Sequence, residues 1–418
     1  MAFLIDSDTL RRGKRNLANF TKKNREDDVK NNKIRLIAGL VLAFFGASAA
    51  LADSIKIGLI TTLSTGGGYL GQDVRDGFLL AIKEEGGKLG GTAVEVLVED
   101  DGRKPETGRA IAERFLERDG VEIMTGIIFS NISPVVAPLT LRADRFYVTP
   151  NSAPSQFAGK KCHENYFAVA WQNDSLHESA GLNATSQGYK NAYILAPNYQ
   201  AGKDALAGFK RFFNGEIVGE VYTKLGQTDY AAEIAKIRAA KPEMVFQFLP
   251  GGMGINFAKQ YDQAGMNDEV PLVLASPSTD INILRAVGAS MVGISSSSHW
   301  NHDLDNAANK KFVSGFEAAY DRSPTVYASQ GYDTAKLIAS ALAATGGKVL
   351  EDMDGFRAAM KAADFDSVRG PFKFNNNNHP IQNWYSRVVV ERDGQFVNEI
   401  TGTIVENHGD AYASQCSM

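Results

Sequence analysis

From residue 55 onward, short β-branched runs alternate with segments of helical periodicity. The run IKIGLITT at 55–62 is followed by apolar residues at helical spacing over 72–85, and similar strand–helix pairs continue to residue 275. This alternation predicts parallel sheets that carry helices on both faces. The pattern pauses near 171–175 and resumes at 190, so we predict an α/β protein with two doubly wound parallel-sheet lobes.

The last third of the chain follows a different pattern. Amphipathic helices are predicted at 310–320 and 332–344, with no strand between them. Two strands are then predicted at 384–390 and 395–405. The pair Asp393-Gly394 between them is typical of a tight hairpin turn.

The N-terminal segment is typical of an export signal. The uncharged run at 36–51 follows several basic residues and ends in Ala50-Leu51-Ala52, a small-residue cleavage pattern. Residues 1–52 are therefore predicted to be a cleaved signal peptide, which implies a periplasmic protein. An uncleaved anchor is the alternative, although a membrane span needs about 20 apolar residues.

Charge and cysteine content narrow the class further. The formal net charge is −4, and residues 1–52 are mainly basic, so the remainder is more acidic still. Such a chain has no electrostatic reason to bind nucleic acid. The two cysteines, Cys162 and Cys416, are expected to pair in an oxidising compartment, with two free thiols as the alternative.

Motifs for catalysis or cofactor binding are missing from the sequence. There is no Gly-x-Ser-x-Gly, no His-Glu-x-x-His and no Gly-Lys-Ser/Thr, and the glycines at 66–68 lack dinucleotide-binding spacing. His299, His302 and Asp303 offer three potential metal ligands, but a polar loop between lobes is the favoured interpretation. We predict no catalytic residue, no metal and no cofactor.

Polar and aromatic residues follow several predicted strands. In open α/β sheets, ligands bind outside the carboxyl ends of the strands. Ser130 and Asn131 lie at one such end, and Ser133-Pro134 then predicts the start of a helix whose free N–H groups suit an anion. These residues favour a small organic ligand held by hydrogen bonds and ring contacts. Capping and turn formation alone are the alternative.

The order of these elements resembles that of type I periplasmic solute-binding proteins of ABC importers, and in particular the leucine/isoleucine/valine-binding branch. The segments that carry the resemblance are IKIGLITTLSTGGGYLGQDVRDGFLLAIKEEGG, QGYDTAKLIASAL and GPFKF with the final strand pair. The resemblance extends from Ser54 to the C-terminus. It implies two lobes joined by three crossovers near 171–175, 299–303 and 370–374. It also implies an N-terminal lobe of 53–172 plus 301–371 and a C-terminal lobe of 173–300 plus 372–418.

The resemblance also implies a function. A monomer would capture a small carboxylate in the cleft, close around it and deliver it to an ABC permease in the inner membrane. Ser130 matches the serine that holds the ligand carboxylate, Asn151–Ala153 match the next binding loop, and Tyr199 matches a tyrosine of the second lobe. The predicted ligand-binding residues are Tyr69, Phe129, Ser130, Asn131, Asn151, Ser152, Ala153, Tyr199, Phe248 and Ser276.

One departure from the family pattern concerns the ligand. Amino-acid binders carry an acidic residue where this chain has Ser276 or Pro277, and Asp280 comes only three residues after Pro277. A buried ammonium without a carboxylate partner costs on the order of several kcal/mol. An aromatic acid therefore fits better than a branched-chain or other amino acid, and both stay open.

Two functions of other classes compete with this prediction. The alternative function is an exported enzyme on a two-lobed scaffold acting on a small organic acid. A sugar-type transcription regulator is disfavoured, because a signal sequence stands where a DNA-binding helix-turn-helix would be.

Overall fold

The computed structural model describes residues 54–418. The predicted signal peptide, residues 1–52, lies outside the described residues. Within 54–418, no helix is both long enough and apolar enough to cross a bilayer.

The first lobe is built on a six-stranded sheet in the order β2-β3-β1-β4-β5-β6. All neighbouring strands are parallel except the short β2–β3 pair. The strands are β1 (Ile55–Thr61), β2 (Lys88–Leu89), β3 (Thr92–Asp100), β4 (Ile123–Thr125), β5 (Phe146–Thr149) and β6 (Tyr166–Ala168). The predicted strand 121–129 is thus much shorter in the structure, and residues 127–130 lie outside the sheet.

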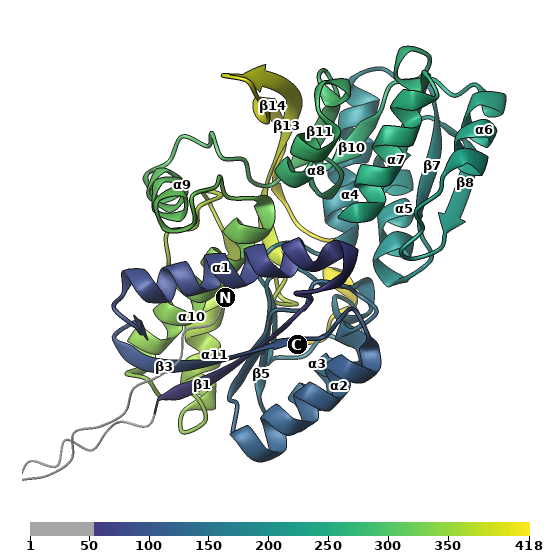
Figure 1. The fold of residues 1–418 in the computed structure, drawn as a ribbon. Coiled ribbons are helices and arrows are strands. Elements are labelled where there is room, and N and C mark those ends of the chain that lie inside the picture. Colours follow the sequence, from purple (N-terminus) through teal and green to yellow (C-terminus); the bar gives the residue numbers. More distant parts are fainter. Residues whose placement is uncertain (1–53) are drawn as a thin grey trace, which may run out of the picture. The chain divides into compact units, whose positions relative to one another are not determined.

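Helices cover both faces of this sheet (Figure 1). They are α1 (Gly68–Glu84), α2 (Pro105–Arg114), α3 (Ser133–Arg142), α9 (Ala307–Tyr320), α10 (Val326–Thr345) and α11 (Met353–Ala362). The α1 and α10 backbones approach closely through glycines. A Cβ on Gly77 would lie 2.0 Å from the Ala328 carbonyl oxygen, and one on Gly331 would lie 2.0 Å from that of Val74. Only glycine permits this approach without a shift of the backbone.

The second lobe contains two strand groups, β8-β7-β9 and β10-β11-β13-β12, with β14 paired to β13. A single parallel bridge between Val245 and Leu272 joins the groups. The strands are β7 (Asn191–Pro197), β8 (Glu216–Thr223), β9 (Met244–Gln247), β10 (Val273–Ala275), β11 (Ser295–Ser298), β12 (Lys373–Phe374), β13 (Pro380–Arg392) and β14 (Gln395–His408).

Alternate residues of β7 pack into different cores, because successive side chains of a strand point to opposite faces. Ile194 lies in the core that contains Phe209 of α5, whereas Leu195 lies in the core that contains Phe257 of α7. The helices of this lobe are α4 (Asn173–Ser186), α5 (Gln200–Phe212), α6 (Ala231–Ala240), α7 (Gly252–Gln263) and α8 (Ile281–Val287).

The structure confirms the predicted C-terminal hairpin and the disulfide. β13 and β14 pair in antiparallel fashion, and Asp393 and Gly394 between them both have positive φ, at 50° and 74°. Two successive positive φ angles give the turn twist that suits a hairpin. The disulfide joins Cys162, just before β6, to Cys416 near the C-terminus.

The chain crosses between the lobes three times, after β6, after β11 and after α11. His299, which follows β11 at the second crossing, contacts two tryptophan rings, Trp171 at the first crossing and Trp384 of β13. The His299 ring lies edge-on to Trp171, with centroids 5.2 Å apart, and to Trp384, with centroids 5.6 Å apart. Arg369 ties the same region together, since it donates to the carbonyls of Val169 and Ala170 and pairs with buried Asp333 at 2.9 Å.

Candidate functional site

A cavity lies between the lobes. Its wall combines residues that follow strands of both sheets with residues of α4 and the first turn of α10. Five of the predicted ligand-binding residues line it: Phe129, Ser130, Asn151, Tyr199 and Phe248.

Hydroxyl groups cluster at one end of the cavity. The Ser130 Oγ lies 2.7 Å from the Ser152 Oγ, which in turn lies 2.5 Å from the Ser133 Oγ. The Asn173 Nδ2 donates to the Ser130 Oγ at 3.2 Å. Because that amide occupies a lone pair on the oxygen, the Ser130 hydroxyl is left free to donate its own hydrogen, to Ser152 or into the cavity.

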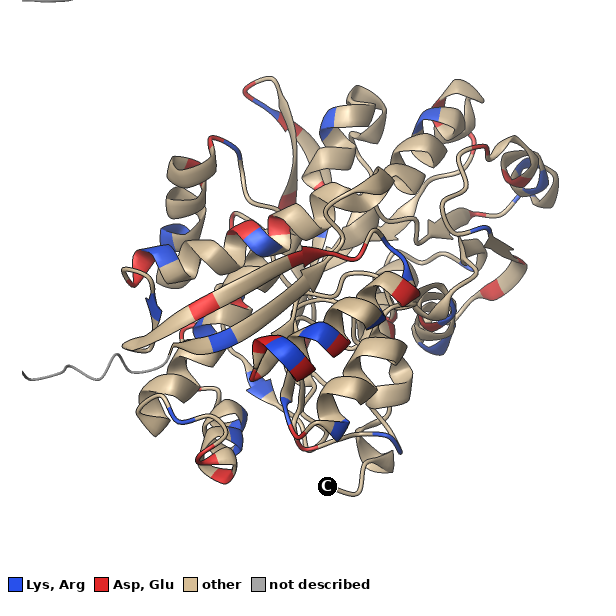
Figure 2. Ribbon diagram, turned by 60° about the horizontal axis from the view of Figure 1, so that its bottom comes forward, with Lys and Arg blue, Asp and Glu red and all other residues tan. Residues whose placement is uncertain are grey.

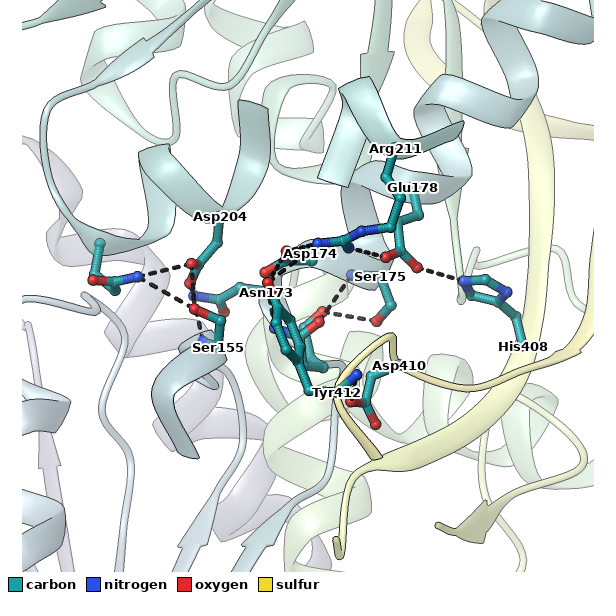
Figure 3. A network of polar contacts seen from close by, with 12 residues as sticks. Ser155, Asn173, Asp174, Ser175, Glu178, Asp204, Arg211, His408, Asp410 and Tyr412 are labelled. Atoms are coloured by element: carbon teal, nitrogen blue, oxygen red, sulfur yellow. Dashed lines mark hydrogen bonds and ion pairs between the residues drawn. The ribbon is translucent and has the colours of Figure 1, made fainter. Parts of the chain in front are cut away.

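Asn173 is fixed in place by both lobes (Figure 3). Its Oδ1 accepts from the backbone N–H of Ala153 in the first lobe, and its Nδ2 also donates to Asp204 of α5 at 3.0 Å. Asp204 in turn accepts from the Ser155 hydroxyl, at 2.7 Å, across the gap between lobes. Burial raises the pKa of the Asp204 carboxyl above its ordinary value. The position of Ser130 therefore depends on an interlobe network.

A second layer of charged residues supports α4 from behind (Figure 3). Arg211 of α5 pairs with Asp174, at 3.0 Å, and with Glu178. His408, at the end of β14, contacts Glu178 at 2.6 Å, and the Tyr412 hydroxyl donates to Asp174 at 2.7 Å. Burial, with the nearby Asp204 charge, raises the pKa of Asp174 to about 6. These contacts hold the first turns of α4 against α5 and the C-terminal tail.

Aromatic rings form much of the remaining wall. The Tyr199 and Phe248 rings are nearly parallel, with centroids 6.5 Å apart, and Phe129 lies 6.5 Å from Tyr199 at a tilted angle. His177 of α4 lies edge-on to Phe248, with centroids 4.7 Å apart. Flat aromatic faces of this kind suit a planar apolar ligand.

The other predicted ligand-binding residues lie near the cavity without lining it. Ser152 and Ala153 form the layer behind, where they contact Ser130 and Asn173. The Asn131 amide reaches the carbonyl of Arg103, and the buried Tyr69 hydroxyl has no hydrogen-bond partner among the described residues.

Ser276 lines a different cavity, together with Asp280, Arg387 and Asn398. Asp280 and Arg387 are both fully buried there, which raises the pKa of Asp280 to about 7 and lowers that of Arg387 to about 9.

Several cavity residues were not among the predicted ligand-binding residues. They are Leu70, Ile128, Trp171, Asn173, Leu176, His177, Ala201, Pro250, Pro277 and Tyr327. Three of them come from α4, a helix whose polar sequence gives little apolar periodicity. The sequence pointed to two of them, Trp171 at the start of the predicted crossover and Pro277 at the departure from the family pattern.

No Asp, Glu, Lys or Arg is among the residues that line this cavity in the described part of the chain. The guanidinium of Arg103 lies 5.6 Å from the centre of the Phe129 ring, outside the lining. Elsewhere, acidic and basic residues are interspersed along outer helices such as α2, where Arg109 and Glu113 pair at 2.8 Å (Figure 2).

The loop HWNHD was predicted to be a polar loop between the lobes, but its first residue, His299, is buried. His299 is 1% exposed, and neither of its ring nitrogens has a hydrogen-bond partner among the described residues. Burial, with the charges of Arg369 and Arg387, holds the pKa of His299 well below its usual range, so the ring is neutral. Within 54–418, no group of three His, Cys, Asp or Glu side chains could hold a metal ion.

Comparison with known proteins places this geometry in a family. The periplasmic binding protein family matches residues 54–395. A Leu/Ile/Val-binding protein homolog 6 of Brucella melitensis is 28% identical over 390 residues, which cover 90% of this chain and 98% of that protein.

Solved structures are similar over nearly the whole described chain. A solute-binding protein of an ABC transporter from R. palustris, in complex with benzoate, has a TM-score of 0.82 and 29% identity, covering 87% of this chain and 100% of that one. A second from R. palustris, in complex with 4-hydroxybenzoate, has a TM-score of 0.78 and 28% identity, with 85% and 98% covered. A leucine-binding protein of Thermotoga maritima, at 18% identity and a TM-score of 0.74 with 84% and 98% covered, shares the fold. The chain therefore belongs to the periplasmic binding protein family, with the two-lobed fold of ABC-transporter solute-binding proteins.

Proposed function

We propose that this protein captures a small aromatic carboxylate in the cavity between its lobes and delivers it to an ABC permease. The observation that carries this proposal is the composition of the cavity. Hydroxyl and amide groups gather around Ser130, aromatic rings form much of the remaining wall, and no acidic side chain of the described residues is part of the lining.

The lack of an acidic side chain favours an acid without an ammonium group. An amino acid bound here would bury its ammonium against neutral residues, at a cost on the order of several kcal/mol. Asp280, which could serve that ammonium, lines the neighbouring cavity instead. An aromatic acid carries only the carboxylate charge and places its ring against Phe129, Tyr199 and Phe248.

The carboxylate has neutral donors available. The Ser130 hydroxyl is oriented by Asn173, as described above. The first turn of α5 begins after Tyr199, which makes no side-chain capping bond, and Ala201 in that turn lines the cavity. Free N–H groups at a helix start stabilise an anion.

The similar proteins support the same class of ligand, since two R. palustris structures above 25% identity hold benzoate and 4-hydroxybenzoate. The curated relatives are named for leucine, isoleucine and valine, so a branched-chain amino acid is the second candidate. In either case we propose a non-catalytic, exported monomer whose lobes close on the ligand. Its signal peptide would be removed in the periplasm.

The test is a calorimetric titration of residues 53–418 with benzoate, 4-hydroxybenzoate, leucine and valine, together with a thermal-shift series. We expect the aromatic acids to bind at one site per chain and the amino acids to give no heat. Ligand at 100 times its dissociation constant should stabilise the protein by about 2.7 kcal/mol.

Binding of leucine alone would overturn the aromatic-acid proposal. Chemical change of the bound acid, followed by NMR of the mixture, would instead favour the exported enzyme.

A further inference from the structure

His177 is buried in the wall of the cavity. Its side chain is 1% exposed, projects from α4, and packs edge-on against Phe248 and Phe246, with centroids 4.7 Å and 5.7 Å away. This imidazole is the one titratable ring, tyrosines aside, among the residues that line the cavity.

The imidazole retains unused hydrogen-bonding capacity. Its Nδ1 is buried and has no partner among the described residues. Burial alone lowers the pKa of His177 to about 3, so the ring is neutral at physiological pH and offers one N–H donor and one acceptor nitrogen. A buried polar group without a partner is costly, so in a native structure it calls for an explanation such as a functional role.

The spacing along α4 sets the distance from His177 to the carboxylate end. Asn173 and His177 are four residues apart and both line the cavity, so they lie on one face with Cβ atoms about 5–6 Å apart. Asn173 bonds to Ser130, the proposed carboxylate contact. The ring carbon opposite the carboxylate is the ring position farthest from Ser130, so a hydroxyl there extends one turn along α4 toward His177.

We propose that His177 selects aromatic carboxylates that bear a hydroxyl group on the ring carbon opposite the carboxylate. This inference rests on the proposed function. The hydroxyl can donate to one imidazole nitrogen or accept from the other, and in either arrangement the buried ring gains the partner that the protein does not supply. An unsubstituted ring leaves the imidazole unpaired.

The experiment is a set of calorimetric titrations with benzoate, 4-hydroxybenzoate, 3-hydroxybenzoate and 4-methylbenzoate on wild-type protein, H177F and H177Q. Wild type should prefer 4-hydroxybenzoate over benzoate by about tenfold. It should prefer 4-hydroxybenzoate over 4-methylbenzoate at least as strongly, because the methyl group fills the same space without hydrogen bonding. H177F should lose the preference, whatever its affinity for benzoate itself, whereas H177Q should keep part of it.

The matched control is H163F, which replaces a histidine before β6 that is not part of the cavity and should keep the wild-type ratios. Thermal melts verify that each variant is folded, and H177Q carries the test if H177F is not. Equal affinity of wild type for benzoate, 4-hydroxybenzoate and 4-methylbenzoate, or an unchanged preference in H177F, would overturn this inference while leaving the aromatic-acid function intact. Failure of every aromatic acid to bind would overturn the proposed function itself.

Discussion

At Ser130, a single hydroxyl joins the protein network to the proposed ligand. Replacing it with alanine removes the donor to the carboxylate, while the Asn173 amide keeps its bond to Asp204. We expect S130A to weaken benzoate binding by about 1–3 kcal/mol, the range for a hydrogen bond to a charged group. Calorimetry measures the loss of affinity.

S133A is the matched control, because the Ser133 hydroxyl contacts Ser152 and does not line the cavity. Equal effects of the two variants would remove Ser130 from the binding site.

Asp280 makes folding stability depend on pH. Its folded-state pKa of about 7 exceeds the ordinary value of 3.8, chiefly because of burial, so the folded protein holds the proton more tightly than the unfolded chain does. The stabilisation is complete below about pH 4 and is lost as the pH rises toward 7. D280N stays neutral and keeps a side-chain acceptor for the N–H of Asn282.

We therefore expect D280N to match the wild type in denaturant melts at pH 4 and to exceed it at pH 8 by on the order of 1–3 kcal/mol. A D280N protein that is less stable than wild type at pH 8 would show instead that the ionised carboxylate is stabilised by Arg387.

Among the elements, α4 joins the cavity to the second-lobe sheet through polar contacts. Ser179 lies 2.8 Å from the Ser297 hydroxyl of β11, and Asn183 donates to Ser295 at 3.1 Å. All four side chains are wholly or largely buried. S179A leaves the Ser297 hydroxyl without this partner, whereas after S297A the Ser179 hydroxyl still donates to the Leu176 carbonyl. We expect S179A to lower the free energy of unfolding by about 1–3 kcal/mol and S297A to lower it by less.

The double variant should lose less than the sum of the two single losses, because it leaves no orphaned hydroxyl. Chemical denaturation of the four proteins measures the difference. Strict additivity would mean that the pair is not coupled.

The helix α4 and the strand β11 also show why the sequence predicted only part of the structure. Strands such as β1 and β7 were predictable, because β-branched runs alternate with helical apolar spacing. The strand β11 reads SSSS and α4 reads NDSLHESAGLNATS, so their contacts come from hydrogen bonds that no apolar period announces.

The same limit applies to the cavity. Phe129, Ser130 and Tyr199 follow strands that the pattern locates, and the carboxyl-end rule brings them together. Asn173 and His177 depend on a helix that was not predicted, and Tyr327 enters from α10 far along the chain. Only the folded chain shows that these side chains meet.

On the scale of the whole molecule, Asp204 of α5 joins the lobes beside the cavity, since it accepts from the backbone N–H and the hydroxyl of Ser155. Asn173 and Gln200 hold the same carboxylate from within the second lobe. Because closure is shared by all ligands, weakening it lowers the population of the binding-competent state and reduces every affinity by the same factor. A change in a residue that touches the ligand instead reduces the affinities for different ligands by different factors.

D204N tests this distinction, because it exchanges one acceptor oxygen for a donor that faces other donors. We expect D204N to bind benzoate and 4-hydroxybenzoate more weakly by one common factor of about tenfold, which reflects roughly 1.4 kcal/mol of lost closure energy. X-ray scattering should show a larger radius of gyration than for wild type at equal ligand concentration. D268N, an exposed change between α7 and β10, is the matched control. A shift in the ratio of the two affinities would mean that Asp204 acts on the ligand. A uniform loss of affinity together with an expanded molecule would mean that Asp204 stabilises the closed arrangement of the lobes.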